Sequence, residues 1–269
     1  MMPYPVRVFR VLTFEALLDG VRRRIVPVIV AISLLSLLAI DSCTSCASSP
    51  LTVNGQPVDA TAIAGWSGAL MFTALALWTM VLAGALASDH LAQTLVDGSA
   101  TLTLARPVGR GAYALARLTG CLTIALVTGA VLLSATALLM HARAGVPLGP
   151  AAWGLVVCAV GAICVGAFAT AASLFLPQIA TTLLVLVAVG WIALVNLLAQ
   201  FGAELPGVHS AIDRFGPPLG SALVVVLAPW IQSDSVTGDP AALILRLAVW
   251  AGAGLALLVL TFRRIEFGR

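Results

Sequence analysis

Cys43 and Cys46 form a C-x-x-C pair, the spacing in this sequence that comes closest to a redox or metal site. Thiolates bind soft metal ions such as copper, and in an oxidising compartment the same pair forms a disulfide. Neither His nor Met flanks the pair, so a disulfide or two free thiols is the simpler interpretation and a metal site is the alternative. Cys121, Cys158 and Cys164 lie in apolar stretches and are expected to pack as small apolar side chains.

Much catalytic chemistry is excluded by residue types that the chain lacks. There is no Lys, which removes P-loop nucleotide binding, Schiff-base catalysis and Ser-Lys dyads. Neither a G-x-S-x-G nor an H-E-x-x-H motif occurs, and His90, His141 and His209 are not paired inside apolar stretches as haem would require. The sequence therefore predicts a chain that is not an enzyme and holds no cofactor. If ATP drives it, ATP and Mg²⁺ are expected on a separate subunit.

Three polar side chains fall inside stretches that are otherwise apolar. Arg246 lies near the start of the last stretch, and a charge at such a place is a candidate functional group. Alternatively, it reaches the membrane interface or pairs with an outer carboxylate such as Asp239. Asn196 and Gln200 are spaced i, i+4, which suits either hydrogen bonds between helices or a lining for an outer pathway.

The elements that position these residues follow from composition. The chain has 269 residues, of which 61% are hydrophobic and 9% charged, too few charges to cover a soluble core. Six apolar stretches approach the length of about 20 residues that spans a bilayer as a helix. The sequence therefore predicts an all-α, polytopic membrane protein with one transmembrane domain over residues 1–269. The predicted spans are residues 25–41, 66–87, 118–140, 151–176, 179–200 and 240–262.

The arginines indicate the orientation of these spans. With six spans, the segments before the first, between the second and third, and after the last all fall on one side. Eleven of the 14 basic residues lie in those segments, and the positive-inside rule then places both termini in the cytoplasm. The first 47 residues also resemble a long signal peptide, but five further apolar stretches follow, which favours a retained span.

Three segments outside the spans are expected to carry structure. Residues 6–24 predict a helix at the cytoplasmic surface, with Phe9, Leu12 and Ala16 on one face. Residues 88–117 predict a long cytoplasmic loop containing a short helix. Residues 201–239 predict an outer segment with a short amphipathic helix near residues 206–215 and a re-entrant or interfacial segment at residues 219–230.

Between the second and third predicted spans lie Asp97 and Gly98, then the run 106–110 (RPVGR), and Arg117 follows. With this motif, the pattern as a whole resembles the ABC-2-type permeases of ABC exporters. Such permeases carry a motif between their second and third spans with an acidic residue, a Gly-Thr-like stretch, Pro-x-Ser-Arg and a later basic residue. Gly109 stands here where the family usually has Ser, and the Glu-rich lead-in is reduced to Asp89 and His90. The matching positions are Asp97, Gly98, Thr101, Leu102, Leu104, Arg106, Pro107, Val108, Gly109, Arg110 and Arg117.

This resemblance implies that residues 88–117 contain a coupling helix that seats in an ATPase subunit. Asp97, Gly98, Arg106, Pro107 and Arg110 would form the coupling site, with the arginines making charge-assisted bonds or contacting lipid phosphates. The implied partners are ABC ATPase subunits, a second permease copy or paralogue, and membrane lipids of a bacterial inner membrane, with no nucleic acid. The substrate and the direction of transport are left open.

Two other functions compete with this interpretation. A secondary transporter or channel would place broken helices or charged residues near mid-membrane, where this chain is nearly all apolar. An intramembrane enzyme would need a nucleophile, a base or metal ligands facing one another, which the sequence does not suggest. An associated ATPase would distinguish the ABC permease from both.

Overall fold

The computed structural model describes residues 4–22, 52–53, 56–57, 60–96, 109–203, 206–231, 236 and 238–264. The predicted first span, 25–41, lies outside the described residues, as does the Cys43–Cys46 pair. Two short strands, β1 (Thr52–Val53) and β2 (Gln56–Pro57), form an antiparallel hairpin. The rest of the described secondary structure is helical, in agreement with the predicted helical class.

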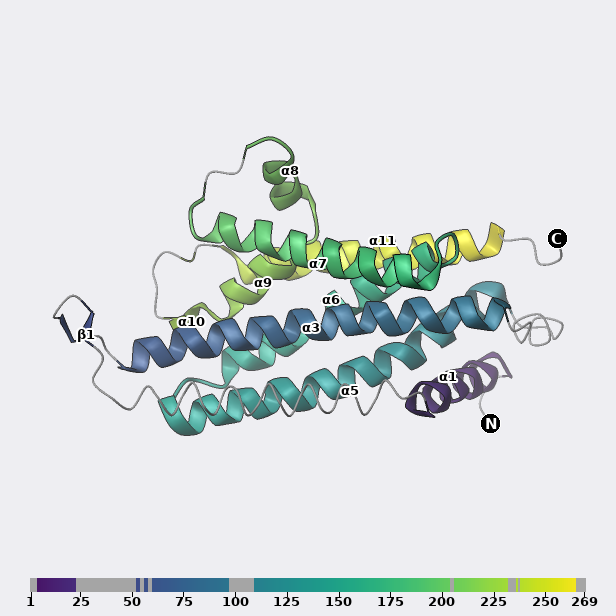
Figure 1. Cartoon of the computed structure of the whole chain (residues 1–269). Helices are drawn as coiled ribbons and strands as arrows, with labels where there is room; N and C mark the ends of the chain where they lie inside the picture. The colour runs from purple at the N-terminus through teal and green to yellow at the C-terminus, as the bar shows by residue number, and fades with distance from the viewer. Residues whose placement is uncertain are drawn as a thin grey trace.

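In the described part of the chain, five long helices run side by side along the length of the molecule (Figure 1). Each is long and apolar enough to cross a membrane, which is the architecture of a multi-pass membrane protein. The predicted spans other than 25–41 each correspond to one of them. The five helices are α3 (Ala60–Val96), α5 (Arg110–Ala144), α6 (Gly149–Ser173), α7 (Gln178–Gln200) and α11 (Pro240–Arg264).

The connection between α3 and α5 is shorter than the sequence predicted. We expected a loop over residues 88–117, but α3 continues to Val96 and α5 already begins at Arg110. The reason is that hydropathy identifies only the apolar part of a helix, whereas backbone hydrogen bonds extend it into polar sequence. Arg117 therefore belongs to a helix rather than to a loop.

Local sequence explains where the helices begin and end. Gly145 ends α5 in the left-handed conformation (φ 65°), and its N–H donates to the carbonyl of His141 at 3.0 Å. Pro177 precedes α7, and Pro240 is the first residue of α11, positions at which a missing N–H costs nothing. Asp239 caps α11, since its carboxylate accepts a hydrogen bond from the Ala241 N–H at 3.0 Å.

Helix α3 is central to the bundle and packs against α5, α6 and α7. Where α3 and α5 meet, a Cβ added at Gly129 would lie 2.4 Å from the Thr79 methyl carbon, so only glycine permits this approach. Phe72 of α3 meets Trp230 edge-on, with ring centroids 5.6 Å apart, and the Trp230 indole N–H donates to the carbonyl of Pro147 at 2.8 Å. Aromatic packing therefore fills this part of the core, and the buried indole N–H has a hydrogen-bond acceptor.

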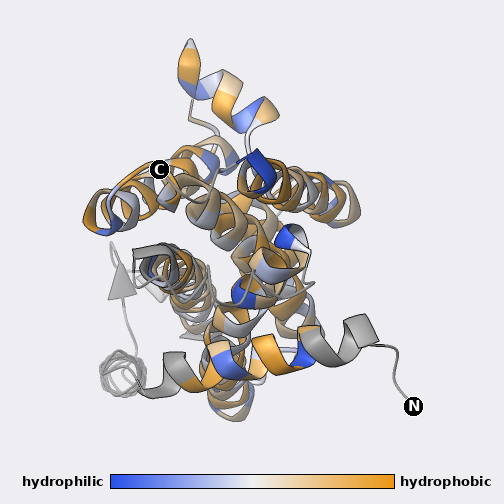
Figure 2. Cartoon of the chain, turned by 90° about the vertical axis from the view of Figure 1, so that its right-hand side faces the viewer, coloured by the Kyte–Doolittle hydropathy of each residue, from blue (hydrophilic) through white to orange (hydrophobic). Residues whose placement is uncertain are grey.

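Helix α1 (Tyr4–Arg22) lies across one end of the bundle, as Figure 2 shows in a view along the long helices. Leu12 and Ala16 are buried against α5, whereas Phe14 and Leu18 are exposed. This confirms the predicted apolar face at Leu12 and Ala16. The C-terminal end of α11 lies at the same end of the bundle (Figure 1), which we call the terminal end.

The segment between α7 and α11 forms three short helices: α8 (Val208–Phe215), α9 (Leu219–Val226) and α10 (Ala228–Ile231). These helices lie toward the opposite end, which we call the distal end (Figure 1). The predicted amphipathic helix is present as α8, which has no buried residue. Every residue of α9 is buried, so the segment expected to be re-entrant or interfacial is packed inside the bundle, with α6, α7 and α11 as neighbours.

The contact between α1 and α5 generates a stability prediction. A Cβ added at Gly120 would lie 2.5 Å from the Ala16 Cβ and 3.0 Å from the Thr13 carbonyl oxygen. Gly120→Leu should therefore displace α1 and lower the free energy of unfolding by about 1–3 kcal/mol, the usual cost of overpacking. Denaturant unfolding in detergent measures this loss, and limited proteolysis reports the release of α1.

Gly252→Leu is the matched control, because a side chain at that position of α11 meets nothing within 4 Å. We expect the control to unfold like the wild type or slightly later, since leucine favours a helix more than glycine does. Equal stability and equal protease resistance of the two variants would contradict the described seat of α1 on α5.

Candidate functional site

The predicted coupling site is described only at its last member. Asp97, Gly98, Arg106 and Pro107 lie outside the described residues. Arg110 is exposed at the first position of α5, and its guanidinium donates to the Arg263 carbonyl of α11 at 3.4 Å. A cation at the end of a helix interacts favourably with the free carbonyls there. Arg110 therefore joins the start of α5 to the end of α11 at the terminal end.

A second group of polar residues near the terminal end is buried. Arg117 of α5 is only 6% exposed, and its guanidinium lies 5.4 Å from the centroid of the Tyr113 ring. That ring stacks on Phe262 of α11, with centroids 6.1 Å apart. Asp89 of α3 is buried as well. The predicted loop 88–117 included both residues, with Arg117 at the start of the next helix, whereas the structure places both in helices and buried in the bundle.

A polar cluster near the distal end joins four helices around Asp213 of α8. The side-chain amide of Asn196 in α7 donates to the Asp213 carboxylate at 3.1 Å. The Asn196 side-chain oxygen accepts from the backbone N–H of Gly220 in α9 at 3.3 Å. Asn196 is fully buried, so both of its polar atoms are satisfied by neighbouring helices.

Arg246 of α11 binds the C-terminal end of α8 in the same cluster. Its guanidinium donates to the Gly216 carbonyl at 2.9 Å from Nε and 2.6 Å from Nη2, and also to the Asp213 carbonyl. One turn later, the Trp250 indole donates to the Phe215 carbonyl at 3.0 Å. The last carbonyls of a helix have no partner within it, and α11 supplies donors for three carbonyls at this end of α8.

These bonds show what the polar residues in the spans contact. The sequence left Arg246 as a functional group, as a side chain that reaches the interface, or as the partner of an outer carboxylate such as Asp239. Asp239 instead caps α11, and Arg246 donates to backbone carbonyls and lies near the opposite charge of Asp213. Asn196 and Arg246 hold the short helices on α7 and α11, which favours packing over a pathway lining. Gln200 is the partly buried last residue of α7.

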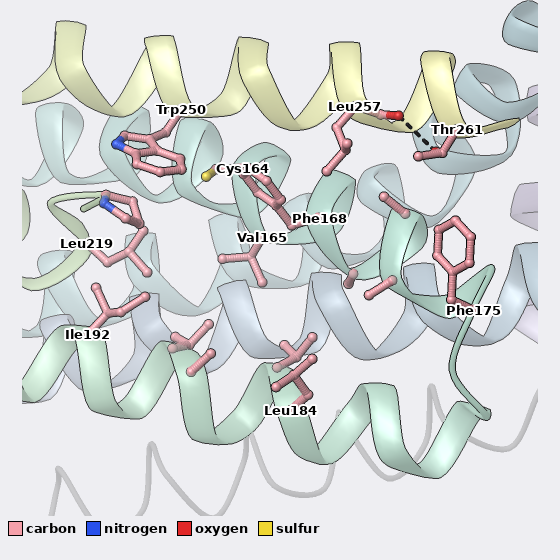
Figure 3. A pocket seen from close by; sticks show the side chains of 17 residues that line it. Cys164, Val165, Phe168, Phe175, Leu184, Ile192, Leu219, Trp250, Leu257 and Thr261 are labelled. Carbon is pink, nitrogen blue, oxygen red and sulfur yellow. Dashed lines mark hydrogen bonds between the residues drawn. The ribbon is translucent and has the colours of Figure 1, made fainter. Parts of the chain in front are cut away.

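An apolar pocket of about 510 Å³ lies between α6, α7 and α11 (Figure 3). Phe168 and Trp250 meet at its wall with ring centroids 6.0 Å apart, and Leu184 and Ile192 of α7 face them across the pocket. Thr261 adds a hydroxyl group to the pocket lining, and this hydroxyl donates to the Leu257 carbonyl of its own helix at 2.8 Å. The pocket suits an apolar ligand and offers nothing to a charged one.

The described part of the chain contains no cluster of metal-binding side chains and no reactive thiol. Among the described residues, no three His, Cys, Asp or Glu side chains come together in a group that could hold a metal ion. Cys121, Cys158 and Cys164 are buried and are not joined in a disulfide, as the apolar packing prediction expected. The His141 Nδ1 lies 2.8 Å from the Val146 carbonyl oxygen, at the turn after α5.

No protein-family profile matches this chain, and no curated protein matches it at significant sequence similarity. The fold therefore defines the class only as a helical, multi-pass membrane protein, with five candidate membrane-spanning helices among the described residues.

Sequence reasoning missed the acceptors in the distal cluster and the pocket beside it. One signal was present, because Arg246 and Trp250 are spaced i, i+4 and place two N–H donors on one face of an apolar helix. Such a face needs acceptors nearby, and the prolines at 217 and 218 mark the helix end that supplies them. The pocket had no comparable signal, since its lining consists of ordinary span residues.

The distal cluster generates a second prediction. Arg246→Met keeps an unbranched stem but removes the guanidinium and its donors, leaving carbonyls at the end of α8 unsatisfied. We expect a loss of stability of about 1–3 kcal/mol and faster amide hydrogen exchange over residues 208–220. Thermal unfolding in detergent and exchange mass spectrometry measure the two effects.

Arg143→Met serves as the control, since Arg143 is exposed in the last turn of α5. This variant should exchange like the wild type over residues 208–220. If Arg246→Met also left exchange unchanged there, the guanidinium would not be what holds α8.

Proposed function

We propose that this chain is the membrane-spanning subunit of an ABC transporter of the ABC-2 type, with ATP hydrolysed by a separate ATPase subunit. The observation that carries the proposal is the make-up of the terminal end. Helix α1 lies across it, α3 and α5 are joined there by residues 97–109, and α11 ends there. A crosswise helix at the end where Arg110 and Arg263 are exposed offers a surface suited to a soluble partner.

Charge supports this choice of end for the partner. Arg110, Arg263 and Arg264 are exposed in described helices at the terminal end, and Arg106 is in the adjoining connection. On the positive-inside rule this end faces the cytoplasm, where an ATPase would bind. Exposed arginines suit charge-assisted bonds to acidic side chains of such a subunit.

The proposed assembly contains two copies of the permease or two paralogues. Only 22% of the most apolar stretch of α11 and 28% of that of α7 is buried. Both helices therefore keep apolar faces for a second subunit or for lipid. ATP-driven closure of two ATPases would then rock two permease halves. We place the assembly in a bacterial inner membrane with both termini in the cytoplasm.

An ion-coupled secondary transporter is a second candidate, and buried Asp89 and Arg117 are the observation that favours it. Ionisable residues inside a membrane protein frequently belong to transport pathways. Asp89, however, lies beyond the apolar stretch 66–87, seven residues before the end of α3 at Val96. Its position near the terminal end of the bundle, where α1 lies, suits a structural role better than an ion site at mid-membrane.

The proposal predicts an ATPase that depends on the connection between α3 and α5. Tagged protein purified from its native membrane in mild detergent should carry a P-loop ATPase, identified by mass spectrometry and by ATP hydrolysis in the eluate. Replacing Arg106 and Arg110 together by Glu should remove most of that ATPase, because two attractive charges become repulsive.

Arg143→Glu is the matched control, because it reverses an exposed arginine at the far end of α5. We expect it to retain the ATPase. A wild-type chain that purifies without any ATPase, and transports only when an ion gradient is imposed, would replace the permease proposal with the secondary transporter.

A further inference from the structure

The apolar pocket has the length of one membrane leaflet. On α11 its lining runs from Trp250 to Thr261, which spans about 16 Å at the rise of an α-helix. Half of the hydrocarbon core of a bilayer is about 15 Å thick. The pocket lies along the long helices rather than across them (Figure 3), so its depth follows the direction of an acyl chain.

The two ends of the pocket differ. Toward the distal end, Leu219 of the buried helix α9 and Trp250 close it, and the Trp250 indole is held by the Phe215 carbonyl. Toward the terminal end, Phe175 and Leu257 line it and are exposed. An acyl chain can therefore enter from the terminal end and from the open side between α7 and α11. Its end must lie on the near side of α9.

An arginine continues the pocket wall at the open end. Leu257, Thr261 and Arg264 are spaced i, i+4 and i+7, so they form one stripe on α11. Arg264 is exposed one turn beyond the last lining residue. By contrast, a Cβ at Gly111 of α5 would lie 3.8 Å from Nε of Arg263, so Arg263 is turned toward α5. A guanidinium at this level suits a lipid phosphate.

We propose that the pocket between α6, α7 and α11 binds one acyl chain of an anionic phospholipid from the leaflet at the terminal end, with Arg264 at the lipid phosphate. Three independent features agree: a fully apolar lining, a depth of one leaflet and a positive charge at the open end. The proposal goes beyond the ABC permease assignment and requires only that the helices cross a membrane.

A photoreactive lipid tests the proposal on the intact chain. The protein is reconstituted in phosphatidylcholine vesicles with phosphatidylglycerol that carries a diazirine near the end of one acyl chain. After illumination, adducts are mapped by mass spectrometry. We expect adducts at the level of Ile192 and Trp250 to exceed those at Val187 and Leu245, which are exposed outside the pocket. A phosphatidylcholine with the same diazirine should label the pocket several-fold less.

Two pairs of variants separate the acyl-chain site from the phosphate site. Ala188→Phe fills the pocket and should abolish its adducts, whereas Ala248→Phe adds the same ring to an exposed position of α11 outside the lining and should not. Arg264→Gln should reduce labelling by phosphatidylglycerol about fivefold, the effect of one charge near a lipid surface, and Arg143→Gln should not. Circular dichroism melting confirms that each variant is folded.

Several results would overturn the proposal. Uniform labelling of pocket and exposed positions in the wild type means that the pocket binds no particular lipid. Equal labelling by the two lipids removes the preference for an anionic lipid, and unchanged labelling in Arg264→Gln removes the phosphate site. A pocket without adducts in a chain that runs as a dimer means that a second copy covers it. None of these results depends on an ATPase, so the permease proposal is tested separately.

Discussion

Backbone N–H and C=O groups in an apolar environment must find partners within the protein, and each that does not costs several kcal/mol. The long helices meet this requirement by pairing the backbone internally. Many threonines in them follow the same rule, because their hydroxyls donate to the carbonyl four residues earlier in their own helix. Examples with distances of 2.6–2.9 Å are Thr79, Thr119, Thr123, Thr128, Thr136, Thr170 and Thr261. Threonine can therefore occur inside a span without requiring a ligand.

The same requirement explains the distal cluster. A short helix such as α8 ends in carbonyls that its own turn cannot satisfy, and prolines 217 and 218, which follow it, have no N–H to offer. Arg246 and Trp250 supply the donors, while Asn196 binds both the Asp213 side chain and the α9 backbone. Arg246, a charged residue in a span, thus donates to backbone carbonyls of a neighbouring helix. Its position in the sequence suggested a functional group, whereas these contacts hold two helices together.

The sequence was sufficient to predict most of the helices but not the ends of two of them. The predicted span 179–200 differs from α7 by one residue, since Pro177 and the end of the apolar run mark its limits. Apolar content could not locate the ends of α3 and α5, which continue through Asp89 and Arg117 into polar sequence. Nor could it show that these two residues are buried, because burial depends on how helices distant in the chain pack together. The distal cluster was predicted only in part, because its acceptors are backbone carbonyls that no side-chain pattern encodes.

One face of α11 connects the distal cluster, the pocket and the terminal end. Arg246, Trp250, Leu257, Thr261 and Arg264 follow one another at helical spacings along this face. Arg246 and Arg264 are separated by about 27 Å along the helix, close to the thickness of about 30 Å of a hydrocarbon core. Trp250 belongs to both neighbouring features, since it lines the pocket and binds the end of α8. Any movement of α8 and α9 away from α11 must therefore alter the closed end of the pocket, which makes the pocket sensitive to the state of the distal helices.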